Sequence, residues 1–306
     1  MKKILIVAGG YSNEREISLL TAKSVLKELK KNKKYKLKIK EPDGNFVKEL
    51  RLYKPDLVLN LLHGRYGEDG YIQAILESEK IKYTHSGVLS SSLAIDKELS
   101  KKIFLKNKIL TPKYIKFIFK KNFEKKKIIQ KVQKKLNFPV VIKPINEGSS
   151  VNVFICNKSN FTINIIKLKS YGEILIEKYI PGREIQVAIL GKEKLGAIEL
   201  KPKRKFYDYE AKYSTKAKTE HIIPVKISNK NHDKVTNIAL KAHNLLKCRG
   251  VTRSDFRFYK NKFYLLEINT QPGMTSLSLV PEIARYNNIS FKKLIQRIIY
   301  DASINK

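Results

Sequence analysis

Short apolar runs that end in glycine-rich loops recur through the first ninety residues, and this alternation constrains the fold more than any other feature. One run covers residues 3–8 before Gly9-Gly10, and another covers residues 56–62 before the loop 63–70. A helix between them is predicted by apolar residues at helical spacing: Leu19, Ala22, Val25, Leu26 and Leu29. A further strand is expected around residues 37–39. Buried strands alternating with amphipathic helices predict a doubly wound parallel sheet, whose ligand groups gather at the carboxyl ends of the strands.

The pattern changes twice after residue 93. Residues 94–135 are rich in lysine and are predicted to be mostly helical, with a break at Thr111-Pro112. Beyond them, apolar and β-branched runs predict strands at 139–144, 173–177, 185–190, 195–200, 256–259 and 263–268. A closing helix is expected from Phe291 onward. A chain of 306 residues suggests about two domains, at roughly 100–200 residues each.

The net charge suggests nucleic-acid binding, but the types of basic residue argue against it. Lysine and arginine total 63 against 28 acidic residues, which gives a formal net charge of +35. An excess of this kind raises the hypothesis of nucleic-acid binding. Lysine greatly outnumbers arginine, however, and arginine is the usual residue for bidentate recognition of phosphates and bases. Together with abundant isoleucine and asparagine, the lysine excess is typical of a codon bias toward A and T, so we expect no specific nucleic-acid partner.

Cysteine usage and hydropathy indicate the compartment. Cys156 and Cys248 lie far apart and lack CxxC spacing, so neither a disulfide framework nor a zinc site is predicted. The apolar run near the N-terminus is shorter than the signal-peptide core of about 7–15 residues. No stretch approaches the roughly 18 apolar residues of a membrane span. We therefore expect a cytoplasmic protein without a membrane partner.

Two predicted strands near the C-terminus carry the most informative polar residues. Asp255 lies on the first strand, and Glu267 and Asn269 end the second, after a hairpin turn at 260–262. Alternate residues of a strand share a face, so the neighbouring strand can bring Asp255 opposite the other two. Two carboxylates and an amide oxygen suit Mg²⁺ that bridges substrate phosphates, and Arg253 is placed to steady a transferring phosphoryl group. The alternative is a ladder of surface salt bridges.

Further candidates lie in loops. Lys143 and the loop 147–150 combine charge, close backbone approach and hydroxyl donors, although the spacing of a Walker A loop is absent. The Pro-Gly turn at 272–273 presents N–H groups that suit a carboxylate or an oxyanion, or it serves only as a capped turn into the helix near residue 280. The polar aromatic segment 206–213 is expected to form a lid. His63, at a strand end, is a candidate base or substrate contact.

Together these motifs resemble the D-alanine–D-alanine ligase family of the ATP-grasp superfamily over essentially the whole chain. The matching segments are GGYSNEREIS at 9–18, HGRYGEDG at 63–70, DK at 96–97, VIKPINEGSSV at 141–151, LIEKYIPGREIQVAIL at 175–190, FYDYEAKY at 206–213, RSDF at 253–256 and LLEINTQPGMTSLSLVP at 265–281. One such segment could arise by chance, whereas eight in the family's order are specific. Two departures are small: Gln271 stands where many relatives have serine, and Asn152 where glycine is common.

The resemblance implies a fold and a reaction. The fold is α/β with an α+β C-terminal part: a doubly wound N-terminal unit (1–93), followed by central (94–178) and C-terminal (179–306) ATP-grasp subdomains that clasp ATP. ATP would phosphorylate the carboxylate of one D-alanine, and the amine of a second would attack the acyl phosphate, giving the dipeptide for peptidoglycan synthesis. Two Mg²⁺ or Mn²⁺ ions and a homodimer are also implied. The alternative is another ATP-grasp carboxylate–amine ligase with a different amino-acid or hydroxy-acid acceptor.

The resemblance also implies a role for each matching residue. The metal ligands would be Asp255, Glu267 and Asn269. The nucleotide contacts would be Lys97, Lys143, Glu177, Lys178, Tyr179, Ile180 and Glu184. The substrate contacts would be Glu14 and His63 for the first D-alanine, and Ser278 and Leu279 for the second. The catalytic groups would be Glu14, Ser149 and Tyr213, which lock the lid, Arg253 and the Gly273 N–H at the tetrahedral intermediate, and Lys212 near the transferred phosphate. Tyr213 stands where depsipeptide-forming relatives carry phenylalanine, so D-alanine rather than D-lactate is the expected acceptor.

Overall fold

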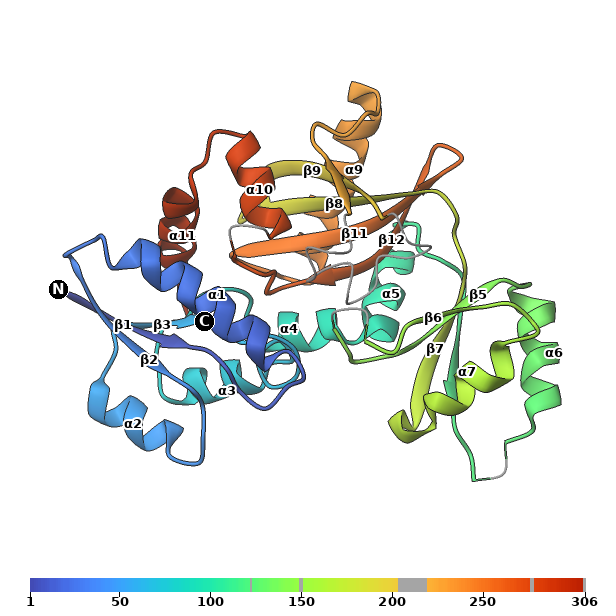
Figure 1. Ribbon diagram of the computed structural model, residues 1–306, viewed down its shortest axis with the longest axis horizontal. Coiled ribbons are helices and arrows are strands. Elements are labelled where there is room, and N and C mark those ends of the chain that lie inside the picture. Colours follow the sequence, from blue (N-terminus) through green and yellow to red (C-terminus); the bar gives the residue numbers. More distant parts are fainter. Residues whose placement is uncertain (122, 149–150, 203–218, 276–277, 305–306) are drawn as a thin grey trace.

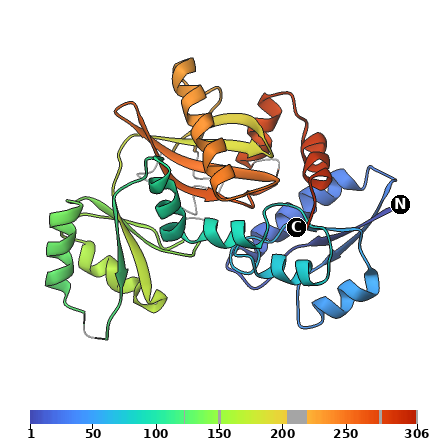
Figure 2. The same ribbon diagram turned by 180° about the vertical axis from the view of Figure 1, so that it is seen from behind.

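The structure is a computed structural model of the chain that describes residues 1–121, 123–148, 151–202, 219–275 and 278–304. Within these residues the chain forms three sheets (Figure 1). The first sheet lies at one end of an elongated molecule, a four-stranded sheet lies at the other end, and a five-stranded sheet lies between and above them. Two consecutive helices connect the first sheet to the others, as the view from behind also shows (Figure 2). These are α4 (Val88–Ile95) and α5 (Lys97–Lys106).

The N-terminal sheet is parallel, with the strand order β2-β1-β3. Its elements are β1 (Lys2–Val7), α1 (Arg15–Leu29), β2 (Tyr35–Lys40), α2 (Phe46–Tyr53), β3 (Leu57–Asn60) and α3 (Tyr71–Ser78). Alternate residues of β1 enter two different cores, because side chains alternate across a strand. Ile4 and Ile6 pack with α1 and with the last helix, α11 (Phe291–Tyr300), whereas Leu5 and Val7 pack with α2 and α3. Helices on both faces confirm the predicted doubly wound arrangement.

The four-stranded sheet is antiparallel, with the order β4-β7-β5-β6. Its elements are β4 (Tyr114–Ile118), α6 (Lys125–Lys135), β5 (Val140–Pro144), β6 (Phe154–Cys156), α7 (Phe161–Lys167), the 3-10 helix η1 (Lys169–Tyr171) and β7 (Glu173–Lys178). Apolar residues of α6 and α7 cover one face of it. Helices α4, α5 and α6 account for more than half of 94–135, as predicted, whereas strand β4 within this stretch was not predicted. Ile115 is buried, and neighbouring Lys116 reaches acidic partners on the other face, which is strand alternation within a lysine-rich stretch.

The five-stranded sheet is also antiparallel, with the order β10-β9-β8-β11-β12. Its strands are β8 (Arg183–Leu190), β9 (Glu193–Lys201), β10 (Glu220–Ile222), β11 (Val251–Tyr259) and β12 (Lys262–Asn269). Its helices are α9 (Asn229–Leu245) and α10 (Leu279–Tyr286). Val187 and Ile189 pack against α9, whereas Ala188 and Leu190 pack in the core that contains α10 and α11. That second core joins this sheet to the N-terminal one.

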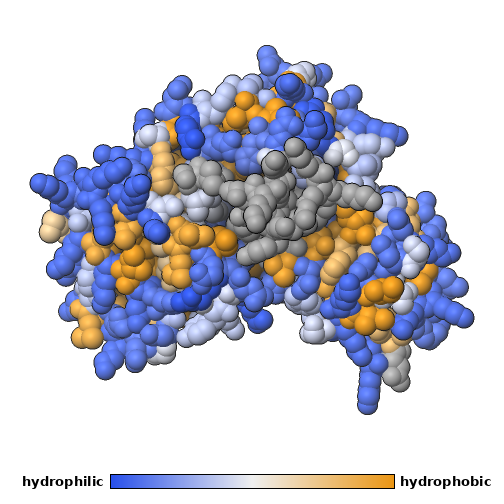
Figure 3. Space-filling model, viewed as in Figure 1, coloured by the Kyte–Doolittle hydropathy of each residue, from blue (hydrophilic) through white to orange (hydrophobic). Residues whose placement is uncertain are grey.

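The surface agrees with the lysine-rich composition. Hydrophilic side chains cover most of the face seen in the space-filling view, with smaller apolar areas between them (Figure 3). In the described part of the chain, every helix is too short or too polar to cross a membrane.

Candidate functional site

Two neighbouring cavities lie where the three sheets meet. The first cavity is lined from the four-stranded and five-stranded sheets by residues that include Lys143, Glu177, Lys178, Tyr179, Ile180, Glu184 and Asp255. The second is lined from all three parts of the chain by residues that include Glu14, His63, Glu68, Gly148, Arg253, Asn269 and Gly273. Lys97, Glu147 and Glu267 line both cavities, so the two share a wall. A molecule in one cavity can therefore meet a molecule in the other at that wall.

Lys97 reaches the shared wall from the start of α5. Asp96 caps this helix, because its side chain accepts hydrogen bonds from the backbone N–H groups of Glu98 and Leu99. The Lys97 ammonium donates to the Glu147 carbonyl at 2.6 Å and lies 3.5 Å from the Glu267 carboxylate. The Asp-Lys pair thus fixes a cation beside the loop that the sequence indicated for phosphate binding.

A buried ion cluster forms the floor of the first cavity. Glu177 on β7 faces Val141 on β5, so Lys143, two residues further along β5, points to the same side as Glu177. The Lys143 ammonium lies 2.9 Å from Glu177 Oε2, and that of Lys101, which is fully buried on α5, lies 2.7 Å from Oε1. Two lysines and one carboxylate leave one positive charge in this cluster.

The protonation states in the cluster follow from burial and from the ion pairs. Burial acts to lower the pKa of Lys143, but Glu177 and Glu267 hold that pKa above its ordinary value. Burial also lowers the pKa of Lys101, to about 8, although Glu177 acts in the other direction. Burial acts to raise the pKa of Glu177, and the two lysines bring it below its usual range. Near neutral pH the cluster is therefore positive, which suits an anionic ligand such as a polyphosphate.

The rim of the first cavity contains the other residues that the sequence placed there. Lys178, Tyr179 and Ile180 follow one another where β7 ends. The Tyr179 N–H donates to the Pro139 carbonyl, which fixes this edge against the start of β5. Glu184, on β8, forms a 3.0 Å ion pair with Arg257 of β11. Both apolar and polar side chains line this cavity, as expected of a pocket for a base and a sugar.

The predicted pairing of the C-terminal carboxylates is confirmed. Asp255 of β11 lies directly opposite Glu267 of β12, and Arg253 lies opposite Asn269. Arg253 donates two hydrogen bonds to the Asp255 carboxylate, at 2.7 and 3.0 Å. Asn269 Oδ1 accepts a 2.7 Å hydrogen bond from the Gln271 N–H. The residues therefore form a satisfied polar group that faces both cavities, not a ladder on an exposed surface.

The same residues fit a magnesium site by donor chemistry. Two carboxylates and an amide oxygen form the all-oxygen set that Mg²⁺ prefers, especially where substrate phosphates supply further ligands. Asp255 faces the first cavity, Asn269 the second, and Glu267 both. Among the described residues, no three His, Cys, Asp or Glu side chains are grouped to hold a metal by themselves. A metal here would thus depend on the amide oxygen and on ligands from the substrate.

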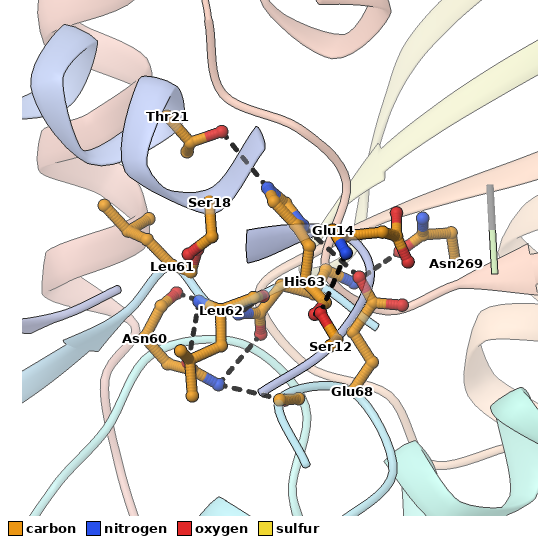
Figure 4. A network of polar contacts seen from close by, with 12 residues as sticks. Ser12, Glu14, Ser18, Thr21, Asn60, Leu61, Leu62, His63, Glu68 and Asn269 are labelled. Atoms are coloured by element: carbon orange, nitrogen blue, oxygen red, sulfur yellow. Dashed lines mark hydrogen bonds and ion pairs between the residues drawn. The ribbon is translucent and has the colours of Figure 1, made fainter. Parts of the chain in front are cut away.

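His63 and Glu14 form the N-terminal wall of the second cavity (Figure 4). His63 Nε2 lies 3.1 Å from Thr21 Oγ1, and Nδ1 lies 3.3 Å from Glu68 Oε1. The Ser12 hydroxyl donates to the His63 carbonyl and accepts from the Glu14 N–H, so it ties the two segments together. This wall presents two carboxylates beside an imidazole, which suits a ligand with an ammonium group.

Glycines allow Glu14 to approach two loops closely. A Cβ at Gly64, whose φ is +70°, would lie 2.7 Å from Glu14 Oε2, and a Cβ at Gly148 would lie 3.0 Å from the same atom. The Glu14 carboxylate is therefore packed between the loop after β3 and the predicted phosphate loop. This contact joins the N-terminal unit to the wall that both cavities share.

The turn after β12 brings Gly273 and Ser278 together. Gly273 lines the second cavity, and a Cβ added to it would lie 3.0 Å from Ser278 Oγ. The Ser278 hydroxyl accepts from the Thr275 N–H at 3.0 Å, while Ser278 itself lies just before α10. Leu279 is buried in the core that joins the sheets and is not among the residues lining either cavity. Ser149, Lys212, Tyr213 and the expected lid 206–213 lie outside the described residues.

Sequence reasoning missed three residues at this site. Lys101 follows Lys97 by four positions, a spacing that places both side chains on one face of a helix. Because this segment was predicted to be helical, the spacing could have indicated that Lys101 lies near the same site. Glu68 lies within the conspicuous 63–70 segment. Gln271 gives no local signal, because its partners lie about two hundred residues earlier.

Comparisons with known proteins agree with this geometry. A family model described as "D-ala D-ala ligase C-terminus" matches residues 103–300. A D-alanine–D-alanine ligase of Pelagibacter ubique (strain HTCC1062) is 65% identical over 305 residues, covering 100% of this chain and 99% of the relative. The crystal structure of a D-alanine–D-alanine ligase from Bacillus anthracis superimposes with a TM-score of 0.87 at 33% identity, covering 98% of this chain and 97% of that one. A structure of the Bacillus anthracis enzyme complexed with ATP gives a TM-score of 0.84 at 29% identity, with the same coverage.

Proposed function

The chain belongs to the family of D-alanine–D-alanine ligases, and from this premise we propose that it joins two D-alanine molecules into D-alanyl-D-alanine at the expense of ATP. One observation carries the proposal beyond the family name. The first cavity has a positive floor for phosphates, the second has carboxylates for an ammonium group, and Lys97, Glu147 and Glu267 belong to both. A phosphoryl group transferred from ATP in the first cavity to an amino acid in the second would pass these three residues.

The proposed reaction has two bond exchanges. A carboxylate is a poor electrophile, so a carboxylate oxygen of the first D-alanine attacks the terminal phosphorus of ATP, and the bond to the ADP oxygen breaks. The amine of the second D-alanine then attacks the carbonyl carbon and gives up a proton, and the C–O bond to phosphate breaks. Lys97 and Lys143 are placed to hold the phosphates during the first exchange. Arg253 and the Gly273 N–H are placed to stabilise the oxyanion of the second.

The remaining assignments follow the family resemblance, and those to Glu14, His63, Glu177, Lys178, Tyr179, Ile180 and Glu184 concern residues that line the two cavities. We place adenine against Glu177, Lys178, Tyr179 and Ile180, and the ribose against Glu184. We place the ammonium of the first D-alanine at Glu14 beside His63, and the carboxylate of the second at Ser278 and Leu279. Ser149 and Tyr213 are proposed to lock the lid with Glu14, and Lys212 to add charge near the transferred phosphate. Closing such a lid excludes water from the acyl phosphate.

The metal assignment rests on the donor set described above. We propose that Asp255, Glu267 and Asn269 hold two Mg²⁺ or Mn²⁺ ions together with the ATP phosphates. When bound, these ions offset the negative charge of the phosphoryl group in transfer. Arg253, which donates to Asp255, keeps that carboxylate oriented toward the first cavity.

Several coarser features complete the proposal. The units 1–93, 94–178 and 179–306 are supported by one sheet each: β1 to β3, β4 to β7 and β8 to β12. A cytoplasmic location follows from the use of ATP, and a role in peptidoglycan precursor synthesis follows from the product. The homodimer is proposed from the family resemblance alone.

One assay tests the function and its alternative. We expect phosphate release with ATP, Mg²⁺ and D-alanine, D-alanyl-D-alanine as the product by mass spectrometry, and little release with L-alanine. D-serine and D-lactate as acceptors, each supplied with D-alanine, should give little mixed product. No release with D-alanine would refute the proposal, and equal turnover of both enantiomers or preference for another acceptor would favour a different carboxylate–amine ligase.

A further inference from the structure

Gln271 connects the N-terminal and five-stranded sheets beside the second cavity. It lies in the turn after β12, is 2% exposed, and its side chain reaches the end of β3. Its Nε2 donates to the Leu62 carbonyl at 2.7 Å and to the Asn60 carbonyl at 3.1 Å. Its Oε1 accepts from Asn60 Nδ2 at 3.1 Å. Both N–H donors and the carbonyl of this amide are thus used within one contact.

The residues on both sides of this contact are close neighbours, along the chain, of residues that line the second cavity. The Gln271 backbone N–H donates to the side chain of Asn269, and Gly273 follows two residues later. On the other side, Leu62 immediately precedes His63, whose ring contacts Thr21 and Glu68. Figure 4 shows Asn60, Leu62, His63 and Asn269 within one connected region of polar contacts. The amide therefore links the wall that contains His63 to the wall that contains Asn269 and Gly273.

Buried hydrogen bonds hold the end of β3 in place next to Gln271. Asn60 is fully buried and also donates to the Gly67 carbonyl, so the end of β3 has little freedom to move away from Gln271 without losing buried hydrogen bonds. A buried amide or carbonyl left without a partner is destabilising, because it has given up its hydrogen bonds to water. The two segments should accordingly keep one spacing while the contact is intact.

We propose that Gln271 is a positioning residue that sets the spacing between the two walls of the second cavity, and so holds the groups for the first D-alanine in register with the oxyanion and metal-ligand groups. The proposal rests on the proposed function for its substrate. Gln271 does not line either cavity, and it acts through Asn269, Gly273 and the end of β3. Displacements of about 1 Å can reduce rates by roughly a hundredfold, so a small change in spacing is sufficient for a kinetic effect.

The test compares Gln271 with another buried glutamine. Gln271→Met keeps the length of the side chain and removes its polar atoms, and Gln271→Ser leaves room for water at the freed carbonyls if the first variant does not fold. Gln73→Met is the matched control, because Gln73 is 1% exposed and donates to the Gly67 carbonyl at 2.8 Å, entirely within the N-terminal unit. The full-length proteins are compared by hydrogen–deuterium exchange, ATP affinity and D-alanine kinetics.

Hydrogen–deuterium exchange tests, independently of enzyme activity, whether Gln271 connects the two segments. We expect faster exchange in both 60–68 and 269–275 for the Gln271 variants, and in the first segment alone for Gln73→Met. Faster exchange in one of the two segments only for the Gln271 variants would overturn the proposal. This readout stands whether or not the wild-type protein turns over D-alanine, so failure of the proposed function is recognised separately, from the wild type.

The kinetics of D-alanine turnover test whether Gln271 positions the two walls of the second cavity. We expect KM for D-alanine to rise by about tenfold or kcat to fall by a similar factor in the Gln271 variants, while the Kd for ATP stays within about threefold, because the contact borders only the second cavity. Gln73→Met should leave both within about threefold. Unchanged D-alanine kinetics in folded Gln271 variants, or an equal loss in Gln73→Met, would overturn the positioning role.

Discussion

At the scale of single residues, the arrangement of charge in the first cavity depends on a lysine that does not line it. Glu177 is bracketed by Lys101 and Lys143, and both lysines are buried. If Glu177 had only Lys143 as a partner, the pair would be neutral and the Lys143 ammonium would be engaged. With Lys101 present, the carboxylate is already neutralised, so the charge of Lys143 remains effective toward a phosphate. Lys101 thus sets the net charge that a nucleotide meets.

Replacing Lys101 with methionine should weaken ATP binding. We expect Lys101→Met to raise the Kd for ATP by about tenfold, equivalent to about 1.4 kcal/mol, because the cluster loses its net positive charge. Adding Glu177→Gln should restore most of the affinity, since the carboxylate that neutralises Lys143 is then removed. Isothermal titration with ATP measures both effects.

The neighbouring lysine supplies a control for this prediction. Lys102 is exposed on the same helix and pairs with Glu98, so Lys102→Met should leave the Kd within about twofold. A Lys101→Met protein with normal ATP affinity, or a double variant no better than the single one, would contradict the charge argument.

Glu267 lines both cavities and is one of the proposed metal ligands. Glu267→Gln should leave the fold intact and reduce kcat by at least about a hundredfold, because an anionic ligand for Mg²⁺ is lost beside the site of phosphoryl transfer. Phosphate-release kinetics over a range of Mg²⁺ concentrations, with thermal unfolding as the control, measure this. Turnover near the wild-type level in a stable variant would remove Glu267 from the metal site.

At the scale of elements, local patterns and pairing decided most of the architecture. The hairpin of β11 and β12 was predicted from its alternation and turn, and a register shift between Asp255 and Phe256 brings Asp255 opposite Glu267. Strand β4 was missed because the lysine-rich stretch around it was predicted to be mostly helical, whereas pairing with β7 determines its conformation. Helix α9 gave no prediction, although it covers one face of the five-stranded sheet. Propensity is a weak guide where tertiary packing decides the outcome.

Helix α11 provides a stability test at this scale. Ile298 lies in the core that joins the N-terminal and five-stranded sheets, so Ile298→Ala should reduce the free energy of unfolding by about 2–5 kcal/mol. Tyr300, at the end of the same helix, is 92% exposed, and Tyr300→Ala should change it by less than about 0.5 kcal/mol. Urea denaturation followed by circular dichroism compares the two. Similar losses in both variants would contradict the packing described for α11.

At the scale of the whole molecule, the site and the surface follow different rules. The candidate site gathers buried carboxylates and paired cations from three sheets, whereas the net charge of +35 comes from lysines spread over the chain. Exposed lysines interact with polyanions through long-range electrostatics, without recognition of sequence. The basic composition is therefore a property of the exterior and carries little information about the reaction.

Polyanion binding should accordingly be salt-sensitive and unselective. We expect the protein to bind duplex DNA of any sequence at about 50 mM NaCl, and to lose at least about a hundredfold in affinity by 200 mM, as counterion release requires. Fluorescence anisotropy with two unrelated duplexes measures this. Sequence-selective binding that persists at the higher salt concentration would instead indicate a specific nucleic-acid partner.

The sequence by itself determined the features that depend on neighbours along the chain. Helical and strand periodicity indicated the doubly wound N-terminal sheet, and strand alternation placed Glu267 and Asn269 on one face of β12. The pairing of Asp255 with Glu267 also needs a register shift between Asp255 and Phe256, which the turn alone does not give. Only the tertiary structure decided that Lys101 and Lys143 share Glu177, and that Gln271 holds the end of β3. These contacts join residues far apart in the chain, where no local pattern records the partner. Burial makes these contacts important for stability, because a polar group removed from water needs a hydrogen-bond or ion-pair partner within the folded protein.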